Sequence, residues 1–516
     1  MIVADDMRTD TMKAYGRKTS VTPGLDGLAS DPRTVVFERA FANFAQCSPS
    51  RLSFMTGLRP DTTGNVDILE WIRSRSSQSL TLPEFFRSNG YTAMTGGKVF
   101  HEKEHPSYSA LGSLWNETYQ PFKNQFMFGG GCKNPRARPF FTAQRQMVAP
   151  GILCQITGGP ESLIDFELEG RATFALTKAA LFPNTPFFIA VGIYKPHLPW
   201  VVHRNYFDRV KSTTNEPTRG PQPQSSFLSI FFDPEVSLYK AGANPTPWAP
   251  VSSAFVSVTR RAYSAAITQT DSRVQVLLDR LEQLKLVNTT MVVFFGDHGF
   301  SLGESGLWNK DTLFDTALRV PLMIRVPWAT IPKSAEQRSI RRASDFFELV
   351  DLYRTLAGLM GLASAVPPGV EGRDHSKYIL AELARTTIRT PIIASGSSEA
   401  YGQVRRCGNL LSGNVMVNRE CFNDDTGEVL PVSWVGYSVR TMEWRYTVWL
   451  NAPNGQVDWS RLLSQELYDH RNDDETLFNY QDGVMYTGEN SNVFARFPDV
   501  TQALLEKLQT QFRKTT

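Results

Sequence analysis

Short runs of β-branched and aromatic residues alternate with helical patterns over most of this 516-residue chain. This alternation is typical of βαβ units, in which helices connect the strands of a largely parallel sheet. Apolar residues recur at helical spacing over residues 265–285, which predicts a long amphipathic helix directly before one of the strands. The candidate core strands are residues 1–4, 91–94, 187–193, 291–295 and 322–326.

Two segments between these strands have contrasting patterns. Thr81 and Glu84 form a capping box, and an Asn-Gly pair ends the predicted helix at residue 90. Residues 205–255 are rich in Pro, Ser, Thr and Asn and show no period. We therefore expect a helix in the first segment and a long surface excursion in the second.

The pattern changes near residue 390 to hairpin-like β segments at residues 436–441 and 445–450, followed by a helix from about Val500. The chain is therefore predicted to form two domains. Residues 1–385 would form the larger α/β domain, and residues 386–516 would form a smaller α+β domain. The first strand is only about four residues long, below the usual ~5–6, so we expect the N-terminal strand to be truncated.

Charge and hydropathy exclude two classes of function. The 54 Lys and Arg residues against 51 Asp and Glu leave a formal net charge of +3, which is too small for a dedicated nucleic-acid-binding protein. No apolar run approaches the ~18–20 residues that a membrane span requires. The first residues do not read as a secretory signal, which taken alone favours the cytosol.

The cysteines favour a different compartment. Four of the five form two local pairs, Cys132 with Cys154 and Cys407 with Cys421, and Cys47 is left over. This arrangement favours two disulfide bonds and one thiol with a separate role, in a protein of an oxidising compartment. It argues against five reduced cysteines. Two glycosylation acceptor tripeptides, at residues 116–118 and 288–290, add weak support for secretion.

Three polar clusters directly follow predicted strands, at Asp5-Asp6, residues 98–101 and Asp297-His298. Ligands bind at the carboxyl ends of strands in an open α/β sheet, and carboxylates gathered there suit a hard divalent cation. Taken singly, each Asp is equally well interpreted as a helix cap or a turn residue. Four histidines without motif context are interpreted as surface residues: His105, His203, His375 and His470.

The segment from Cys47 to Arg51, with the sequence Cys-Ser-Pro-Ser-Arg, runs into a helix-like stretch that Gly57 closes. A Cys just ahead of a helix lies where backbone N–H groups favour an anion, with Arg51 one turn along. These residues alone predict either an anion site or a buried thiol. Cys-x-Pro-x-Arg followed by Thr-Gly, however, resembles the pattern that the formylglycine-generating enzyme recognises in the sulfatase family.

Other strings are similar to this family in the same order, at residues 97–101, 195–197 and 296–304 and at Lys310. Strings in both predicted domains, including residues 59–63 and 436–449, resemble its iduronate-2-sulfatase branch. The resemblance implies an alkaline-phosphatase-like α/β fold, with a large mostly parallel sheet flanked by helices and a smaller C-terminal α+β domain. It also implies a lysosomal or secreted enzyme that removes 2-O-sulfate from iduronate residues of heparan or dermatan sulfate.

The resemblance assigns a role to each motif residue. Cys47 becomes formylglycine, and its hydrate attacks sulfur. The other four cysteines pair locally. Arg51 and His101 hold and activate the hydrate, Lys98 and Lys310 bind sulfate oxygens, and His197 protonates the leaving oxygen. The implied cofactor is a calcium ion bound by Asp5, Asp6, Cys47 as formylglycine, Asp297 and His298.

Three positions depart from the iduronate branch, at Phe300, Ser305 and Asp311, and we expect them to line the sugar region. They leave open a sulfatase for another sulfated sugar or small molecule. A metal-dependent phosphomonoesterase or phosphodiesterase on the same fold is a further alternative, although the motif at Cys47 argues against it. The remaining alternative is an inactive glycosaminoglycan-binding homologue that uses basic residues such as Arg136, Arg138, Arg260 and Arg261.

Overall fold

The computed structural model describes most of the chain. The described residues are 1–16, 19–64, 71, 74–75, 79–101, 116–119, 137–141, 147–148, 153–157, 163–210, 226–229, 253–304, 307–332, 340–386, 398–407, 431–471, 489 and 491–513.

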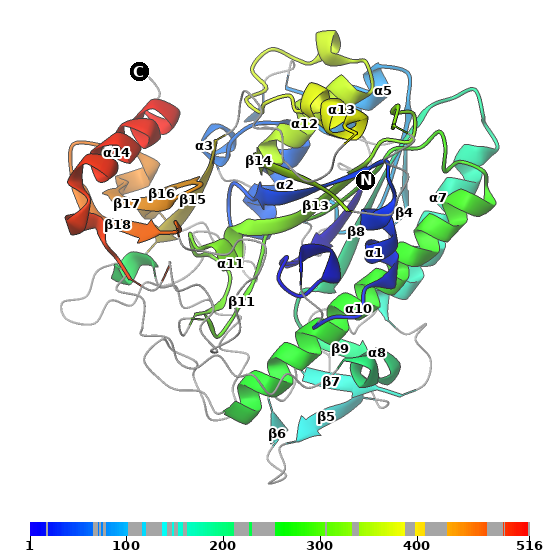
Figure 1. Ribbon diagram of the computed structural model, residues 1–516, viewed down its shortest axis with the longest axis horizontal. Coiled ribbons are helices and arrows are strands. Elements are labelled where there is room, and N and C mark those ends of the chain that lie inside the picture. The colour runs from blue at the N-terminus through cyan, green and yellow to red at the C-terminus, as the bar shows by residue number, and fades with distance from the viewer. Residues whose placement is uncertain are drawn as a thin grey trace.

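A large mixed sheet lies at the centre of the molecule (Figure 1). Its strands, in spatial order, are β14 (Arg341–Glu348), β2 (Thr34–Phe41), β13 (Arg319–Arg325), β10 (Val292–Gly296), β1 (Ile2–Asp5), β8 (Phe187–Pro196), β3 (Thr92–Gly97) and β4 (Glu117–Tyr119). β13 pairs antiparallel with both of its neighbours, and the other neighbouring pairs are parallel. The predicted, largely parallel sheet is therefore confirmed.

Helices cover both faces of this sheet (Figure 1). Alternate residues of β1 point to opposite faces, so that Val3 enters one apolar cluster and Ile2 and Ala4 enter the other. The first cluster includes side chains of α2 (Cys47–Thr56), α5 (Leu82–Ser88), α12 (Leu352–Leu359) and α13 (Ser376–Ala384). The second includes side chains of α1 (Pro23–Ser30), α7 (Ile164–Ala180) and α10 (Ser253–Gln283).

Most of the predicted elements are present. The five expected core strands are β1, β3, β8, β10 and β13, and the Thr81–Glu84 capping box opens α5. The expected helix at residues 265–285 is part of α10, which begins earlier, at Ser253. Residues 205–255 were predicted to form a surface excursion without helices or strands. This prediction is wrong at α8 (Arg204–Arg209) and at the start of α10. Most of the excursion lies outside the described residues.

A smaller antiparallel sheet follows, in the order β15 (Glu399–Cys407), β16 (Val432–Thr441), β17 (Trp444–Asn451) and β18 (Leu462–Asp469), with α14 (Pro498–Phe512) packed against it. The predicted hairpin and C-terminal helix are thus confirmed. Side chains of β15, β16 and β17 also join the core of the large sheet, and Gln403 forms a β-bridge with Phe44. The predicted domain boundary at residue 385 stays a prediction.

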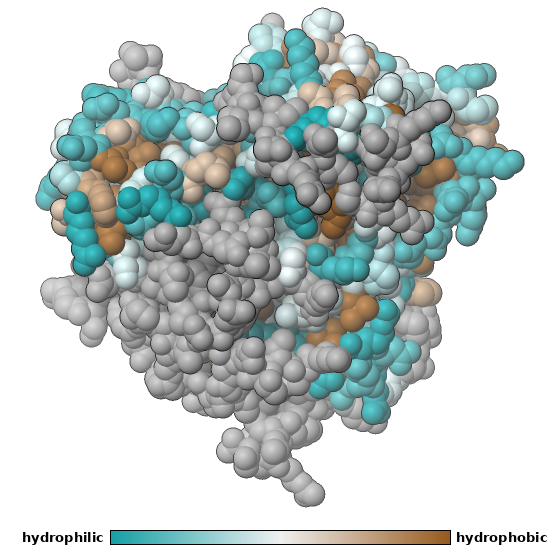
Figure 2. Space-filling view, viewed as in Figure 1, coloured by the Kyte–Doolittle hydropathy of each residue, from teal (hydrophilic) through white to brown (hydrophobic). Residues whose placement is uncertain are grey.

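The surface and the cysteines test further expectations. No helix among the described residues is long and apolar enough to cross a membrane. On the face in Figure 2, hydrophobic side chains form a few small areas among hydrophilic ones on the coloured surface. Cys154 and Cys407 are disulfide-bonded, and Cys47 is a free thiol. Cys132 and Cys421 lie outside the described residues, so the pairing stays a prediction.

Three histidines interpreted as surface residues are in fact buried, so that interpretation is wrong for His203, His375 and His470. His203 caps α8, because its Nδ1 accepts a hydrogen bond from the Asn205 N–H. His375 lies 3.0 Å from the Asp351 carboxylate. Both have polar partners that compensate for the loss of water. The fourth, His105, lies outside the described residues.

Candidate active site

The predicted polar clusters meet at the carboxyl edge of the large sheet. Asp5 ends β1, Lys98 follows β3, His197 follows β8 and Asp297 follows β10, and these four strands are neighbours in the order β10-β1-β8-β3. Parallel strands bring the residues that follow them to one edge, which is why clusters hundreds of residues apart converge.

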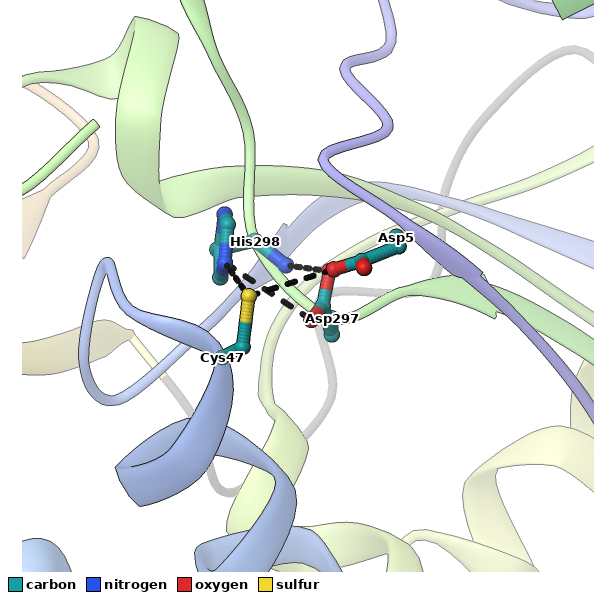
Figure 3. A group of neighbouring side chains, drawn as sticks. All are labelled: Asp5, Cys47, Asp297 and His298. Atoms are coloured by element: carbon teal, nitrogen blue, oxygen red, sulfur yellow. Dashed lines mark hydrogen bonds and ion pairs between the residues drawn. The ribbon is translucent and has the colours of Figure 1, made fainter. Parts of the chain in front are cut away.

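Cys47 lies at the centre of this group, as the first residue of α2 (Figure 3). Its Sγ donates to Asp5 Oδ1 at 3.2 Å and lies 3.2 Å from His298 Nε2. The ammonium groups of Lys98 and Lys310 lie 3.6 and 3.5 Å from the same sulfur. The structure therefore places both lysines and the metal-ligand candidates around one atom.

Three fully buried carboxylates, of Asp5, Asp6 and Asp297, face three buried cations across the site. Arg51 Nη2 lies 3.2 Å from Asp5 Oδ1 and 2.9 Å from Asp297 Oδ2. Lys98 pairs with Asp5, and Lys310 Nζ lies 3.1 Å from Asp6 Oδ1. Three negative charges are thus balanced by three positive charges within the described site.

This balance sets the protonation of the carboxylates. Burial alone raises the pKa of Asp5, but the charges of Lys98 and Arg51 outweigh it and hold that pKa well below its usual range. Burial is likewise outweighed at Asp6, where Lys310 and His197 lower the pKa. Both groups are therefore carboxylates at neutral pH and are available as metal ligands.

The site has the donors that a divalent cation requires. One ligand atom from each of Asp5, Cys47, Asp297 and His298 lies within 4.8 Å of the others. Oδ2 of Asp6 is buried and receives no hydrogen bond, and it lies 4.0 Å from His197 Nε2. A buried carboxylate oxygen without a hydrogen bond is costly unless a cation pairs with it. The carboxylates of Asp5, Asp6 and Asp297 suit calcium, whereas the His298 imidazole and the sulfur of an unmodified Cys47 are atypical ligands for it.

Backbone contacts fix the orientation of this donor set. His298 Nδ1 lies 2.9 Å from the Gly299 carbonyl, which leaves Nε2 as the atom that faces Cys47. The Asp6 and His298 N–H groups donate to Asp297 Oδ1 at 3.0 and 2.9 Å. Asp6 itself has a φ of 61°, a left-handed conformation that Asp tolerates better than most residues.

Burial and the charge of Asp5 raise the pKa of the Cys47 thiol to about 11. An unmodified thiol in this environment is therefore neutral at pH 7, and a neutral thiol is a poor nucleophile.

His197 lies at the rim of the group and is partly buried. Its Nδ1 lies 2.6 Å from the Leu198 carbonyl, so Nε2 is the atom turned toward Asp6. Lys195 supports this segment, because its Nζ donates to the carbonyls of His197 and Pro199 at 2.8 and 2.9 Å. His101 is partly buried three residues after Lys98, and its predicted contact with residue 47 stays a prediction.

Two supporting residues, Tyr263 and Ser50, have no role predicted from the sequence. The Tyr263 hydroxyl, on α10, donates to the Asp6 carbonyl at 2.5 Å and accepts from the Arg8 N–H at 3.1 Å. The Ser50 hydroxyl donates to the Asp297 carbonyl at 2.6 Å. Tyr263 is 257 residues from Asp6 in the sequence and lies just outside the helix predicted at residues 265–285.

The expectation for the sugar region needs one correction. Phe300 is fully buried and stacks on Tyr263 with ring centroids 5.9 Å apart, so it does not line an open sugar subsite. Asp311 is also buried, at 4% exposure. Ser305 lies outside the described residues.

The comparisons with known proteins agree with this geometry. The sulfatase family model matches residues 1–362. Iduronate 2-sulfatase from Mus musculus is 30% identical over 91% of this chain and 88% of that protein. Phosphonate monoester hydrolase from Silicibacter pomeroyi has the same fold, with a TM-score of 0.63, 17% identity and coverage of 99% of this chain and 94% of that one.

A second solved structure, of a protein in complex with its substrate D-glucosamine-2-N,6-O-disulfate, has a TM-score of 0.61 at 17% identity and covers 99% of this chain and 97% of that one. The alkaline-phosphatase-like fold expected from the sequence is therefore present. The family match extends over the whole of the site, from Asp5 to Lys310. The chain belongs to the sulfatase family and is a sulfuric ester hydrolase.

Proposed function

We propose that this sulfatase removes the 2-O-sulfate from iduronate residues of heparan or dermatan sulfate, with formylglycine at residue 47 and a bound calcium ion. The observation that carries the proposal is the arrangement around the first residue of α2. Two ammonium groups lie within 3.6 Å of Cys47 Sγ, in a site that also contains three buried carboxylates, Arg51 and His298. A sulfate monoester is an anion that requires cations around its oxygens and a strong nucleophile at sulfur.

Each requirement has a candidate among the residues of this chain. Conversion of Cys47 to formylglycine would supply a geminal diol, in which one oxygen attacks sulfur and the other allows sulfate to leave. Asp5, Asp6, Asp297 and His298 would hold calcium, which would polarise the sulfate. Lys98 and Lys310 bind sulfate oxygens. Arg51, fixed between Asp5 and Asp297, and His101 hold the hydrate at residue 47.

His197 is proposed as the general acid, with Nε2 as the donor atom. The prediction is that His197→Gln slows hydrolysis of a sugar sulfate about 10³-fold but slows an arylsulfate with an acidic phenol about 10-fold or less. A phenolate leaves without protonation, whereas a sugar alkoxide requires a proton. The measurement is kcat on both substrates. Equal losses on the two would contradict the role of His197 as an acid.

His203→Gln provides a matched control for this variant. His203 is a buried histidine six residues along the chain that caps α8, outside the proposed site. We expect any loss in this control to be equal for the two substrates, because a fold defect does not depend on the leaving group.

The substrate preference is supported by the 30% identity to an iduronate 2-sulfatase. We predict that a disaccharide ending in 2-O-sulfated iduronate is hydrolysed at least about 100-fold more efficiently than substrates bearing glucosamine 6-O-sulfate or galactosamine 4-O-sulfate. All three present the same sulfate group, so the difference arises from contacts with the ring and its carboxylate. The measurement is kcat/KM on each substrate. Equal values would refute the iduronate assignment and leave the sulfatase activity standing.

An aryl phosphate and an aryl phosphonate monoester, assayed beside an arylsulfate, distinguish the phosphoesterase alternative. Preference for either phosphorus ester by protein carrying an unconverted Cys47 would support that alternative. No turnover of any of these esters by converted protein would support the inactive glycosaminoglycan-binding homologue.

The proposed compartment is lysosomal or extracellular, with maturation by the formylglycine-generating enzyme on the secretory route. The disulfide-bonded state of Cys154 and Cys407 supports an oxidising compartment. The motif that the converting enzyme would read, residues 47–51, forms the first turn of buried α2. Conversion would therefore precede completion of the fold.

A further inference from the structure

The backbone around Lys310 adopts an unusual conformation on both sides. Asn309 has a φ of 71° and Asp311 has a φ of 62°. Asn and Asp tolerate this left-handed region better than most residues, but it is uncommon even for them, and here it occurs on both sides of one lysine. Lys310, between them, places its ammonium 3.1 Å from Asp6 Oδ1 and 3.5 Å from Cys47 Sγ. The position of this ammonium therefore depends on the contacts that hold its two neighbours.

Asp311 is held through its backbone from two directions. Its N–H donates to the Ala45 carbonyl at 3.0 Å, two residues before Cys47. Its carbonyl accepts a hydrogen bond from Arg406 Nη2 at 2.6 Å. The first contact connects Lys310 to the segment that carries residue 47. The second connects it to β15, which belongs to the smaller sheet.

Arg406 is a rigid anchor for this second contact. The residue is 1% exposed, and its guanidinium lies 5.2 Å from the ring centroid of Trp449. Nε donates to the Leu228 carbonyl at 3.1 Å, and Nη1 donates to the Arg405 carbonyl at 3.1 Å. Three different nitrogens thus reach three different carbonyls. The guanidinium holds these nitrogens apart in a fixed plane, whereas an ammonium donates from one nitrogen only.

We propose that Arg406 is a positioning residue for Lys310, through which the smaller sheet fixes one wall of the sulfate site. Without the guanidinium, Asp311 loses the bond at its carbonyl and its backbone relaxes toward negative φ, which moves the Lys310 ammonium away from residue 47. Arg406 touches neither the reacting atoms nor the sulfate. The inference rests on the proposed function, because the binding of sulfate by Lys310 is part of that proposal.

The test compares Arg406→Met and Arg406→Lys with the wild type in two assays. One is kcat and KM on an arylsulfate, and the other is the Kd of inorganic sulfate measured by calorimetry on calcium-loaded protein without turnover. For Arg406→Met we expect kcat/KM to fall about 50-fold and sulfate binding to weaken about 10-fold, because small displacements of a positioned group have effects of this size. Arg406→Lys retains the positive charge but only one donor nitrogen, and we expect losses of about 5-fold in both.

Arg405→Met is the matched control. Arg405 precedes Arg406 on β15, and its guanidinium donates to the Gly64 carbonyl at 2.9 Å, away from Asp311. This variant should lower the melting temperature without changing the Kd of sulfate by more than about twofold. Wild-type sulfate affinity and kcat/KM in Arg406→Met would overturn the inference. If that variant does not fold, the same result in Arg406→Lys would overturn it.

The two proposals fail in distinguishable ways. Wild-type protein with formylglycine at residue 47 that neither binds sulfate nor hydrolyses an arylsulfate would refute the proposed function, and the role of Arg406 would fall with it. Wild-type protein that does both, beside an Arg406→Met variant that does both equally well, would refute only the role of Arg406.

Discussion

Replacing Cys47 with alanine is expected to abolish sulfatase activity, with kcat on an arylsulfate reduced at least about 10⁴-fold. The loss is chemical, because alanine can neither be converted to an aldehyde nor offer a nucleophilic oxygen. The fold should survive, since α2 begins at this position and keeps its packing through Leu52, Phe54 and Met55. We expect the melting temperature to change by no more than about 4 °C.

The measurements are turnover, the melting temperature and the mass of the peptide that contains residue 47. Ser53→Ala is the matched control, because it also removes one buried heteroatom from α2 but on the part of the helix beyond the site. Ser53→Ala should retain activity within about threefold. Full wild-type activity in protein whose peptide mass shows an unconverted Cys47 would contradict the formylglycine mechanism, since the buried thiol has a pKa raised to about 11.

Much of the fold was predictable because each strand and helix of the βαβ pattern is indicated by a short, continuous stretch of sequence. Each core strand is a short apolar run, and α5 has a local signal at each end, the capping box at Thr81 and the Asn-Gly pair that begins at Asn89. The site was predictable for a related reason. Residues that directly follow parallel strands must meet at one edge of the sheet, and Asp5, Lys98 and Asp297 do.

The contacts that hold the site were not predictable, because their partners are distant in sequence and act through the backbone. Tyr263 donates to the carbonyl of Asp6, 257 residues away, and Arg406 donates to the carbonyl of Asp311, 95 residues away. A backbone carbonyl carries no sequence signal. The burial of His375 was missed because its partner, the carboxylate of Asp351, lies 24 residues before it on another element.

Removal of the metal is expected to have the second large effect, a loss of activity of at least about 10²-fold that calcium restores. The charges of the described site explain the expectation. Asp5, Asp6 and Asp297 are balanced by Arg51, Lys98 and Lys310, so the site without a metal offers no net positive charge to a sulfate ester. A divalent cation makes the same site positive.

The experiment treats the protein with a chelator, confirms metal loss by elemental analysis, and measures both arylsulfate turnover and the melting temperature. Asp297→Asn should lose the rescue by calcium, because it removes one carboxylate from the cluster with Asp5, Cys47 and His298. Asp61→Asn is the control, since Asp61 contacts Gln403 and Tyr437 away from the site, and it should keep the rescue. Full activity in protein shown to be free of metal would contradict the prediction.

The same charge balance predicts that the metal and the sulfate bind cooperatively. Inorganic sulfate at 100 times its Kd for calcium-loaded protein should stabilise that form by about 2.7 kcal/mol, and the same concentration should stabilise metal-free protein much less. By linkage, sulfate must then tighten the binding of calcium by the factor by which calcium tightens the binding of sulfate. Equal stabilisation of both forms by sulfate would show that Lys98 and Lys310 suffice for the anion, and that the three carboxylates serve only to hold them in place.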